Sequence, residues 1–107
     1  MTDELLRDLL ITAFEGGSNY WIREVDVVRP KAGDIYDVPL MDGGCMYVQC
    51  DECGKAYKLD RSAMRRGSGV LEEKFPKHFS DAVEEDFDAT TADCWLQCCL
   101  FGDVIFG

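Results

Sequence analysis

The sequence has no long apolar run and no feature of a secretion signal. No stretch approaches the roughly 18 consecutive apolar residues of a membrane-spanning helix, so we expect no membrane partner. Residues 1–4 are acidic, whereas a secretion signal begins with basic residues and continues into an apolar segment. We therefore expect a cytoplasmic protein.

Basic residues are scarce. The chain has 11 Lys and Arg against 21 Asp and Glu, and its net charge is −10. Binding to a nucleic-acid backbone needs clustered Lys and Arg, so the composition disfavours direct contact with nucleic acid. An acidic surface favours encounter with a basic partner, or it serves solubility alone. Both interpretations stay open.

Histidine is almost absent, which limits the chemistry that the chain can perform. His78 is the only one. A nucleophilic thiolate needs a base or a positive neighbour that lowers its pKa. His78 is distant in sequence, and the cysteines near the C-terminus stand among acids or on an apolar face. We expect no catalytic residue and therefore no enzyme.

Six cysteines are many for a chain of 107 residues. Because the cytosol keeps thiols reduced, we expect buried thiols, metal ligands or reactive groups. Cys50 and Cys53 have the two-residue spacing of half a zinc site on a tight turn. The other half would come from one of two pairs: Cys94 and Cys98, or Cys45 and His78. A β-hairpin explains the same spacing, so we expect no cofactor and keep zinc as an alternative.

The first half of the chain predicts a helix and then a strand. Apolar residues recur at helical spacing over residues 3–15, and Thr2 is placed to cap the first turn. Gly16 and Gly17 should end this helix. Residues 20–28 interleave β-prone and charged side chains, which is typical of a strand.

The middle of the chain predicts a loop and a β-hairpin. Glycines and a proline stand among polar residues over 31–44, so we expect a loop there, with a short extended piece at 35–40. Two β-prone runs flank a turn with a glycine in the segment 46–59. This segment should form an antiparallel hairpin.

The second half predicts helices. Asp60 can cap a helix that Gly67 and Gly69 interrupt or end. Residues 70–75 would then form a separate turn, and a further helix would begin at Pro76.

The last helix is the clearest element. Asp88 is a candidate N-cap, and Gly102 should close the helix. Apolar residues between them follow the spacing of one buried face: Ala92, Trp95, Leu96, Cys99 and Leu100. Together the elements predict a single α+β domain over residues 1–107, with three to four helices packed on a short antiparallel sheet.

Two separated segments have the character of sequence motifs, in which nearly every residue type looks constrained. Residues 15–21 read Glu-Gly-Gly-Ser-Asn-Tyr-Trp, and residues 88–102 read Asp-x-x-Thr-Ala-Asp-x-x-x-Gln-x-x-Leu-Phe-Gly. In this order, and followed by an apolar segment that ends in Gly107, they resemble a group of small uncharacterised proteins encoded by bacteriophages and prophages. The resemblance covers most of the chain. It implies a phage context inside a host bacterial cell and no particular chemistry.

Binding residues are expected in these two segments. Glu15, Asp88 and Asp93 could line one cleft if the first and last helices pack together, and such acids share a proton or bind a metal ion. Helix capping explains Asp88 equally well. A polar-aromatic pocket for a small molecule would use four side chains: Asn19, Trp21, Asp93 and Gln97. Tyr20 and Trp21 could also stack on a base or a sugar ring. Core packing is the alternative role for the two aromatic residues.

The densest acidic patch lies just before the last helix and consists of Glu84, Glu85, Asp86 and Asp88. We expect a non-enzymatic phage accessory protein that binds a host or phage protein through this acidic surface. The resemblance, together with the small size and the acidity, implies a role such as inhibition of a host defence system. The acidic patch could then occupy a nucleic-acid groove of the partner by mimicry of phosphate charge. A nucleotide-like small-molecule-binding protein and a zinc-stabilised structural module remain the alternatives.

Overall fold

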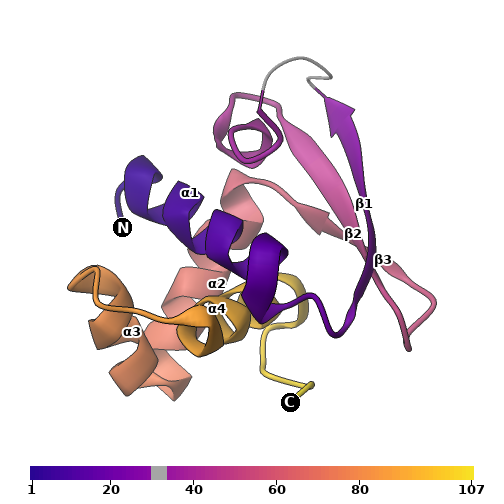
Figure 1. Ribbon diagram of the computed structural model, residues 1–107. Helices are drawn as coiled ribbons and strands as arrows, with labels where there is room; N and C mark the ends of the chain where they lie inside the picture. The colour runs from indigo at the N-terminus through magenta and orange to yellow at the C-terminus, as the bar shows by residue number, and fades with distance from the viewer. Residues whose placement is uncertain (30–33) are drawn as a thin grey trace.

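The computed structural model describes residues 1–29 and 34–107 and confirms the α+β fold (Figure 1). Four α-helices lie in the described part: α1 (Asp3–Thr12), α2 (Arg61–Lys74), α3 (Pro76–Val83) and α4 (Ala89–Phe101). Three strands form one antiparallel sheet: β1 (Ile22–Arg29), β2 (Cys45–Cys50) and β3 (Ala56–Leu59). No helix of the described residues is long and apolar enough to cross a bilayer.

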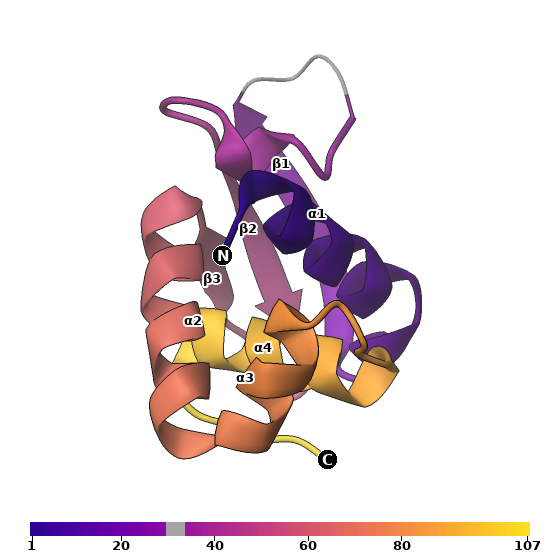
Figure 2. The same cartoon turned by 90° about the vertical axis from the view of Figure 1, so that its left-hand side faces the viewer.

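The sheet has the order β1-β2-β3, so β2 is its central strand. Val48 of β2 pairs with Val25 on one side and with Tyr57 on the other, which confirms the hairpin over 46–59. The helices lie on one side of this sheet (Figure 1). Turned by 90°, the molecule shows α1 and α2 in front of the strands, with α4 crossing below them (Figure 2).

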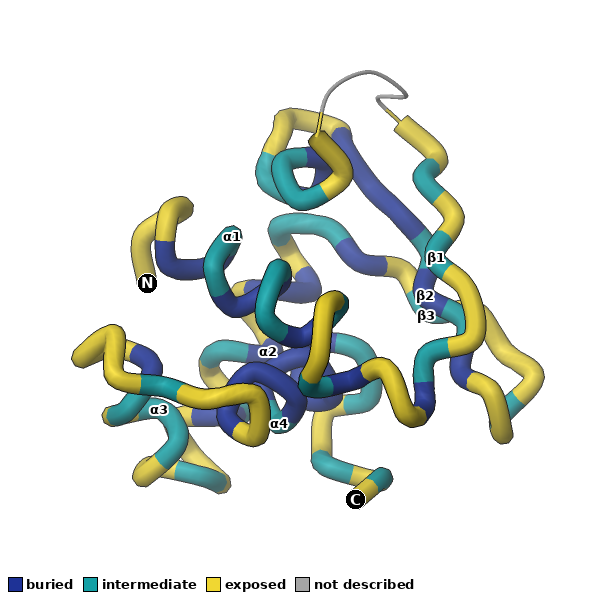
Figure 3. Tube along the Cα trace, in the orientation of Figure 1, coloured by how far each residue is buried: buried dark blue, intermediate teal, exposed yellow. Residues whose placement is uncertain are grey.

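Helix α4 runs through the centre of the molecule and is buried on nearly every side (Figure 3). Trp95, Leu96 and Cys99 are buried as the apolar spacing predicts, but Asp93 and Gln97 are buried as well. The apolar spacing predicts burial of only one face of α4. In the structure α4 packs against α1, α2, α3 and β3, so other faces are buried as well. Two polar side chains therefore lie in the core, where each needs hydrogen-bonding partners.

The predicted helix caps are confirmed. The side chains of Thr2, Asp60 and Asp88 each accept a hydrogen bond from the backbone N–H three residues later. Gly102 ends α4 with φ +73°, a conformation that glycine adopts without steric cost.

The first helical segment ends at Gly17, as its two glycines predict, but its last turn, η1 (Ala13–Gly17), is π-helical. One prediction in the first half of the chain is wrong. Residues 35–40 are not extended, because turns and the short 3-10 helix η2 (Val38–Leu40) occupy this segment. The start of the predicted loop, residues 31–33, lies outside the described residues.

The break predicted within α2 is also wrong. The helix is continuous through Gly67 and Gly69 and includes most of the segment 70–75 that was expected to be a separate turn. Gly67 is required by packing instead, because a Cβ there would lie 2.4 Å from the Cα of Cys99 and 2.5 Å from its backbone nitrogen. A glycine at this position lets α2 and α4 touch backbone to backbone.

Gly67→Ala should lower the free energy of unfolding by about 1–3 kcal/mol, because the added methyl group must push the two helices apart. Gly69→Ala is the matched control in the same helix, where a Cβ would meet no atom within 4 Å. This control should raise stability by roughly 0.5–1 kcal/mol through the better helix propensity of alanine. Urea denaturation measures both, and equal effects of the two substitutions would contradict the close helix contact.

Candidate functional site

The carboxylate of Asp93 on α4 collects four side-chain hydrogen bonds. Its Oδ1 accepts from Ser18 Oγ at 2.8 Å, from Trp21 Nε1 at 2.7 Å and from Gln97 Nε2 at 3.1 Å. Its Oδ2 accepts from Tyr20 Oη at 2.6 Å. Only 8% of Asp93 is exposed. A buried carboxylate needs such donors to replace the water that it loses.

Three of these donors lie in the segment that directly follows the π-helical turn η1. The backbone N–H of Ser18 donates to the carbonyl of Ala13 at 2.8 Å, which closes the turn. A Cβ on Gly17 would lie 2.3 Å from the carbonyl oxygen of Ala89, so η1 rests directly on the first turn of α4. This contact brings together the two motif segments, residues 15–21 and 88–102, at Asp93.

Gln97 connects the same site to the end of the chain. Its Oε1 accepts from the backbone N–H groups of Ile105 and Phe106 at 2.8 and 2.9 Å, and its Nε2 also donates to the Phe106 carbonyl at 3.3 Å. The Phe106 ring stacks on Trp21 with their centroids 5.5 Å apart. The terminal apolar segment is therefore part of the Asp93 site.

Tyr20 is held as a hydrogen-bond donor. Burial of its hydroxyl and the neighbouring Asp93 carboxylate raise the pKa of Tyr20 to about 12, because both disfavour the phenolate. The residue as a whole is 56% exposed, so much of its side chain meets solvent.

An open pocket of about 750 Å³ lies beside this network. It is bounded by the glycines of η1, the first turn of α4 and the C-terminal segment. Tyr20 and Phe106 supply aromatic walls, and Asp93 supplies the carboxylate. Ala89 and Thr90 also line it and directly follow Asp88, so the pocket begins where the acidic patch ends.

The structure gathers some of the predicted binding residues and separates others. Tyr20, Trp21, Asp93 and Gln97 meet in one network, but Asn19 is exposed and takes no part in it. The expected cleft of three carboxylates does not form. Glu15 and Asp88 are exposed and do not line the pocket, and the Asp93 carboxylate faces donors rather than other acids.

Sequence reasoning missed Ser18 as a site residue. It is completely buried and donates to Asp93, although serine usually lies at the surface. Its position inside the segment 15–21 was the available signal. Phe106 was also missed, since the final apolar tail carries no motif that predicts stacking on Trp21.

The cysteines do not form the alternative zinc site. Cys50 and Cys53 are joined by a disulfide bond across the β2–β3 turn, so the expectation of free thiols is wrong for this pair. Cys94 and Cys98 are free. In the described part of the chain, no three His, Cys, Asp or Glu residues lie close enough together to hold a metal ion. Burial raises the pKa of Cys98 to about 12 and also raises that of Cys94, which keeps both as thiols.

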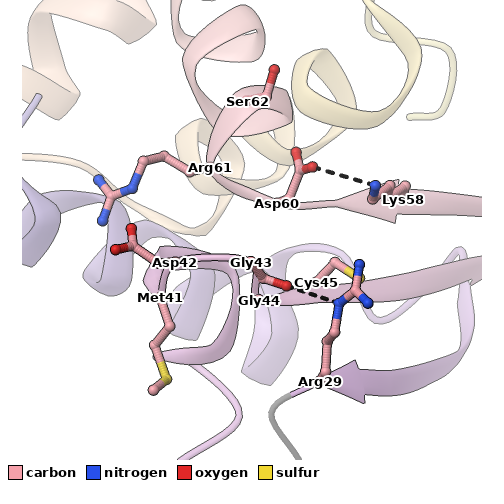
Figure 4. Close-up of a pocket in the computed structure, with 10 residues that line it drawn as sticks. All are labelled: Arg29, Met41, Asp42, Gly43, Gly44, Cys45, Lys58, Asp60, Arg61 and Ser62. Carbon is pink, nitrogen blue, oxygen red and sulfur yellow. Dashed lines mark hydrogen bonds and ion pairs between the residues drawn. The ribbon is translucent and has the colours of Figure 1, made fainter.

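A second pocket, of about 290 Å³, lies where the sheet meets the start of α2 (Figure 4). Its cationic side chains are Arg29, Lys58 and Arg61. Each has a partner within the protein. Arg61 binds Asp3 through two hydrogen bonds of 2.7 and 3.0 Å, Lys58 lies 3.8 Å from Asp60, and Arg29 donates to a backbone carbonyl at 3.0 Å. These charges stabilise the corner of the fold.

The acidic patch occupies the loop 84–88 between α3 and α4. Glu84, Glu85 and Asp86 are exposed, and within the described residues none of them has a basic side chain within ion-pair distance. The nearby Lys77 pairs instead with Asp81 at 2.7 Å. Asp88 differs from the other three because its side chain caps α4. The three unpaired carboxylates are therefore free to meet another molecule.

Comparisons of the chain with protein-family models, with curated proteins and with solved structures found no match. The function of this site must therefore be argued from its geometry and charge.

Asp93→Ala should lower the free energy of unfolding by about 2–4 kcal/mol, because the buried donors of Ser18 and Trp21 lose a charged acceptor. Asp86→Ala removes the same group from the exposed loop and should change stability by less than about 0.5 kcal/mol. Urea denaturation followed by tryptophan fluorescence measures both. Similar stability of the two variants would show that the network does not hold the fold together.

Stability should fall between about pH 10 and pH 12 in a way that depends on Tyr20. The phenol loses its proton near pH 10 in the unfolded chain and only near pH 12 in the folded protein, so rising pH favours unfolding in this window. Tyr20→Phe should remove this component of the pH dependence. Thermal unfolding across the range, with Tyr47→Phe in β2 as the control, tests this, and an unchanged slope in Tyr20→Phe would contradict it.

Proposed function

We propose that this chain is a non-enzymatic accessory protein of a bacteriophage that binds a host or phage protein through the loop 84–88. The supporting observation is the set of three exposed carboxylates in this loop, which have no ion-pair partner in the described part of the protein. The net charge of −10 adds to their field. Clustered charge of one sign speeds encounter with a surface of the opposite sign.

The loop is presented by rigid supports. Helix α3 ends at Val83, α4 begins at Ala89, and the cap by Asp88 fixes the junction. Glu85 adopts φ +57°, which bends the chain between its neighbours. In Figure 1 the loop forms the edge of the molecule farthest from the sheet. An acidic loop at the edge of the molecule is suited to entering a basic groove.

The partner that fits this surface is a protein with a basic groove, such as a nucleic-acid-binding protein of the host. Closely spaced carboxylates can occupy the positions of phosphates there. The resemblance to proteins of phages and prophages supports a role against such a host protein, for example inhibition of a defence system. The protein would then act by occupying the groove, which requires no catalytic residue.

A small-molecule-binding protein is the second candidate, and the open pocket beside Asp93 favours it. Tyr20 and Phe106 could stack on a planar ring. The carboxylate of Asp93 and the net charge of −10 oppose the phosphates of a nucleotide, however. Protein binding is the better-supported function for this reason.

Reversal of three charges in the loop tests the proposal, as the variant Glu84→Lys, Glu85→Lys, Asp86→Lys. Asp88 is left unchanged, because its loss would remove the cap of α4 and destabilise the fold. The control reverses three exposed acids elsewhere, Glu52, Glu72 and Glu73, and changes the net charge by the same amount.

Tagged protein is mixed with host lysate at low and at physiological salt, and bound proteins are quantified by mass spectrometry. A partner retained by the wild type and by the control should be lost at least about tenfold in the loop variant, since interfacial charge pairs that are removed cost more than one factor of ten. Equal retention by the loop variant would refute binding through this loop.

A further inference from the structure

We infer that the pocket beside Asp93 receives an arginine side chain of the partner protein. The inference rests on the proposed function, because it names the group by which a basic partner would be anchored next to the acidic loop.

The carboxylate of Asp93 has capacity left on the oxygen that Tyr20 contacts. Its Oδ1 accepts three hydrogen bonds, whereas Oδ2 accepts one, from Tyr20 at 2.6 Å. A carboxylate oxygen has two lone pairs, so Oδ2 can accept another donor. Asp93 itself lines the pocket. A guanidinium group presents charged N–H donors in a plane, which is the preferred partner of a carboxylate.

The aromatic walls fit the same group. Tyr20 and Phe106 both line the pocket, and more than half of Tyr20 is exposed. Phe106 is held in place by stacking on Trp21 and by the hydrogen bonds of its backbone to Gln97. A guanidinium plane stacks on aromatic faces while its edge donates hydrogen bonds. An arginine side chain can bind the carboxylate and stack on the aromatic rings at the same time. Lysine lacks the planar group that stacks.

Size and charge agree with this occupant. The pocket of about 750 Å³ is large enough for an arginine side chain and open enough to receive it from another molecule. Among the described residues that line it none is basic, so the protein supplies no cation of its own there. The second pocket differs in this respect, because Arg29, Lys58 and Arg61 line it and Lys58 already pairs with Asp60.

The position beside the acidic loop completes the argument. Asp88 ends the loop, and the next two residues, Ala89 and Thr90, line the pocket. A basic surface attracted by the loop would therefore place its side chains at the pocket mouth. Interfaces are commonly held by a few anchors of this type, and arginine is enriched among them.

A titration with a single capped amino acid tests the inference without the partner. The probe is acetyl-argininamide, and the control probe is the citrulline analogue, which has nearly the same shape and no charge. Two indole N–H signals in the NMR spectrum of the labelled protein report the result. Trp21 Nε1 donates to Asp93, whereas Trp95 Nε1 donates to Ser68 Oγ at 3.1 Å outside the pocket and serves as an internal reference.

The Trp21 signal should shift with a saturable dependence on the arginine probe, and the Trp95 signal should stay in place. The citrulline probe should bind at least about tenfold more weakly, since its neutral urea group lacks the attraction between a cation and the carboxylate. Equal shifts with the two probes, or a shift of both indole signals together, would overturn the inference.

A pair of glycine variants localises the binding. Gly16 lines the pocket and Gly69 lies in α2, and a Cβ at either position would meet no atom within 4 Å. Gly16→Arg should abolish the saturable shift, because its own guanidinium competes for the pocket. Gly69→Arg adds the same charge elsewhere and should leave the shift unchanged. Binding that survives in Gly16→Arg would place the probe outside this pocket and refute the inference.

The outcome is separable from that of the loop experiment. If the loop variant loses its partner but the arginine probe does not bind, the pocket inference fails and the proposed function stands. If the arginine probe binds and the loop variant keeps its partner, the pocket inference stands and the acidic loop is not the binding surface.

Discussion

The buried carboxylate of Asp93 is the interaction on which the rest of the site depends. It joins three parts of the chain, because its donors come from the turn after α1 and from α4, and one of them, Gln97, also holds the C-terminal segment. A charge in the core is costly unless donors replace its hydration. Each donor therefore has to be placed accurately. This requirement explains why the segments 15–21 and 88–102 look constrained at so many positions.

Some charges of the molecule have partners within the protein, and others do not. At the corner near α2, arginine and lysine side chains are engaged by acids or by backbone carbonyls of the protein itself. The loop 84–88 instead gathers three exposed carboxylates without such partners in the described residues. Clustered charge of one sign orients the protein in the field of a basic partner. This arrangement also explains how a chain with a net charge of −10 folds stably, since the excess acids lie where solvent can surround them.

Local signals in the sequence were sufficient for much of the fold. Capping residues, the turn glycine of the hairpin and the apolar spacing of α4 all act within a few residues, so they can be read without knowledge of the rest. Gly67 shows the limit. A helix-breaking glycine and a glycine that permits close packing look identical in one sequence, and only the neighbour Cys99, 32 positions later, distinguishes them. The Asp93 site was foreseen only in part for the same reason: Trp21, Asp93 and Gln97 could be named as polar-aromatic candidates, but the buried role of Ser18 depends on how η1 rests on α4.

The separation of these partners along the chain has a consequence for biosynthesis. Ser18, Tyr20 and Trp21 stand 72 to 75 residues before Asp93. During translation these donors leave the ribosome long before their acceptor is made, and contacts of such long range form late in folding. The pocket cannot exist on a nascent chain that lacks α4 and the segment after it. A protein released prematurely from the ribosome would expose its first helix and sheet to the cell without ever presenting a binding site.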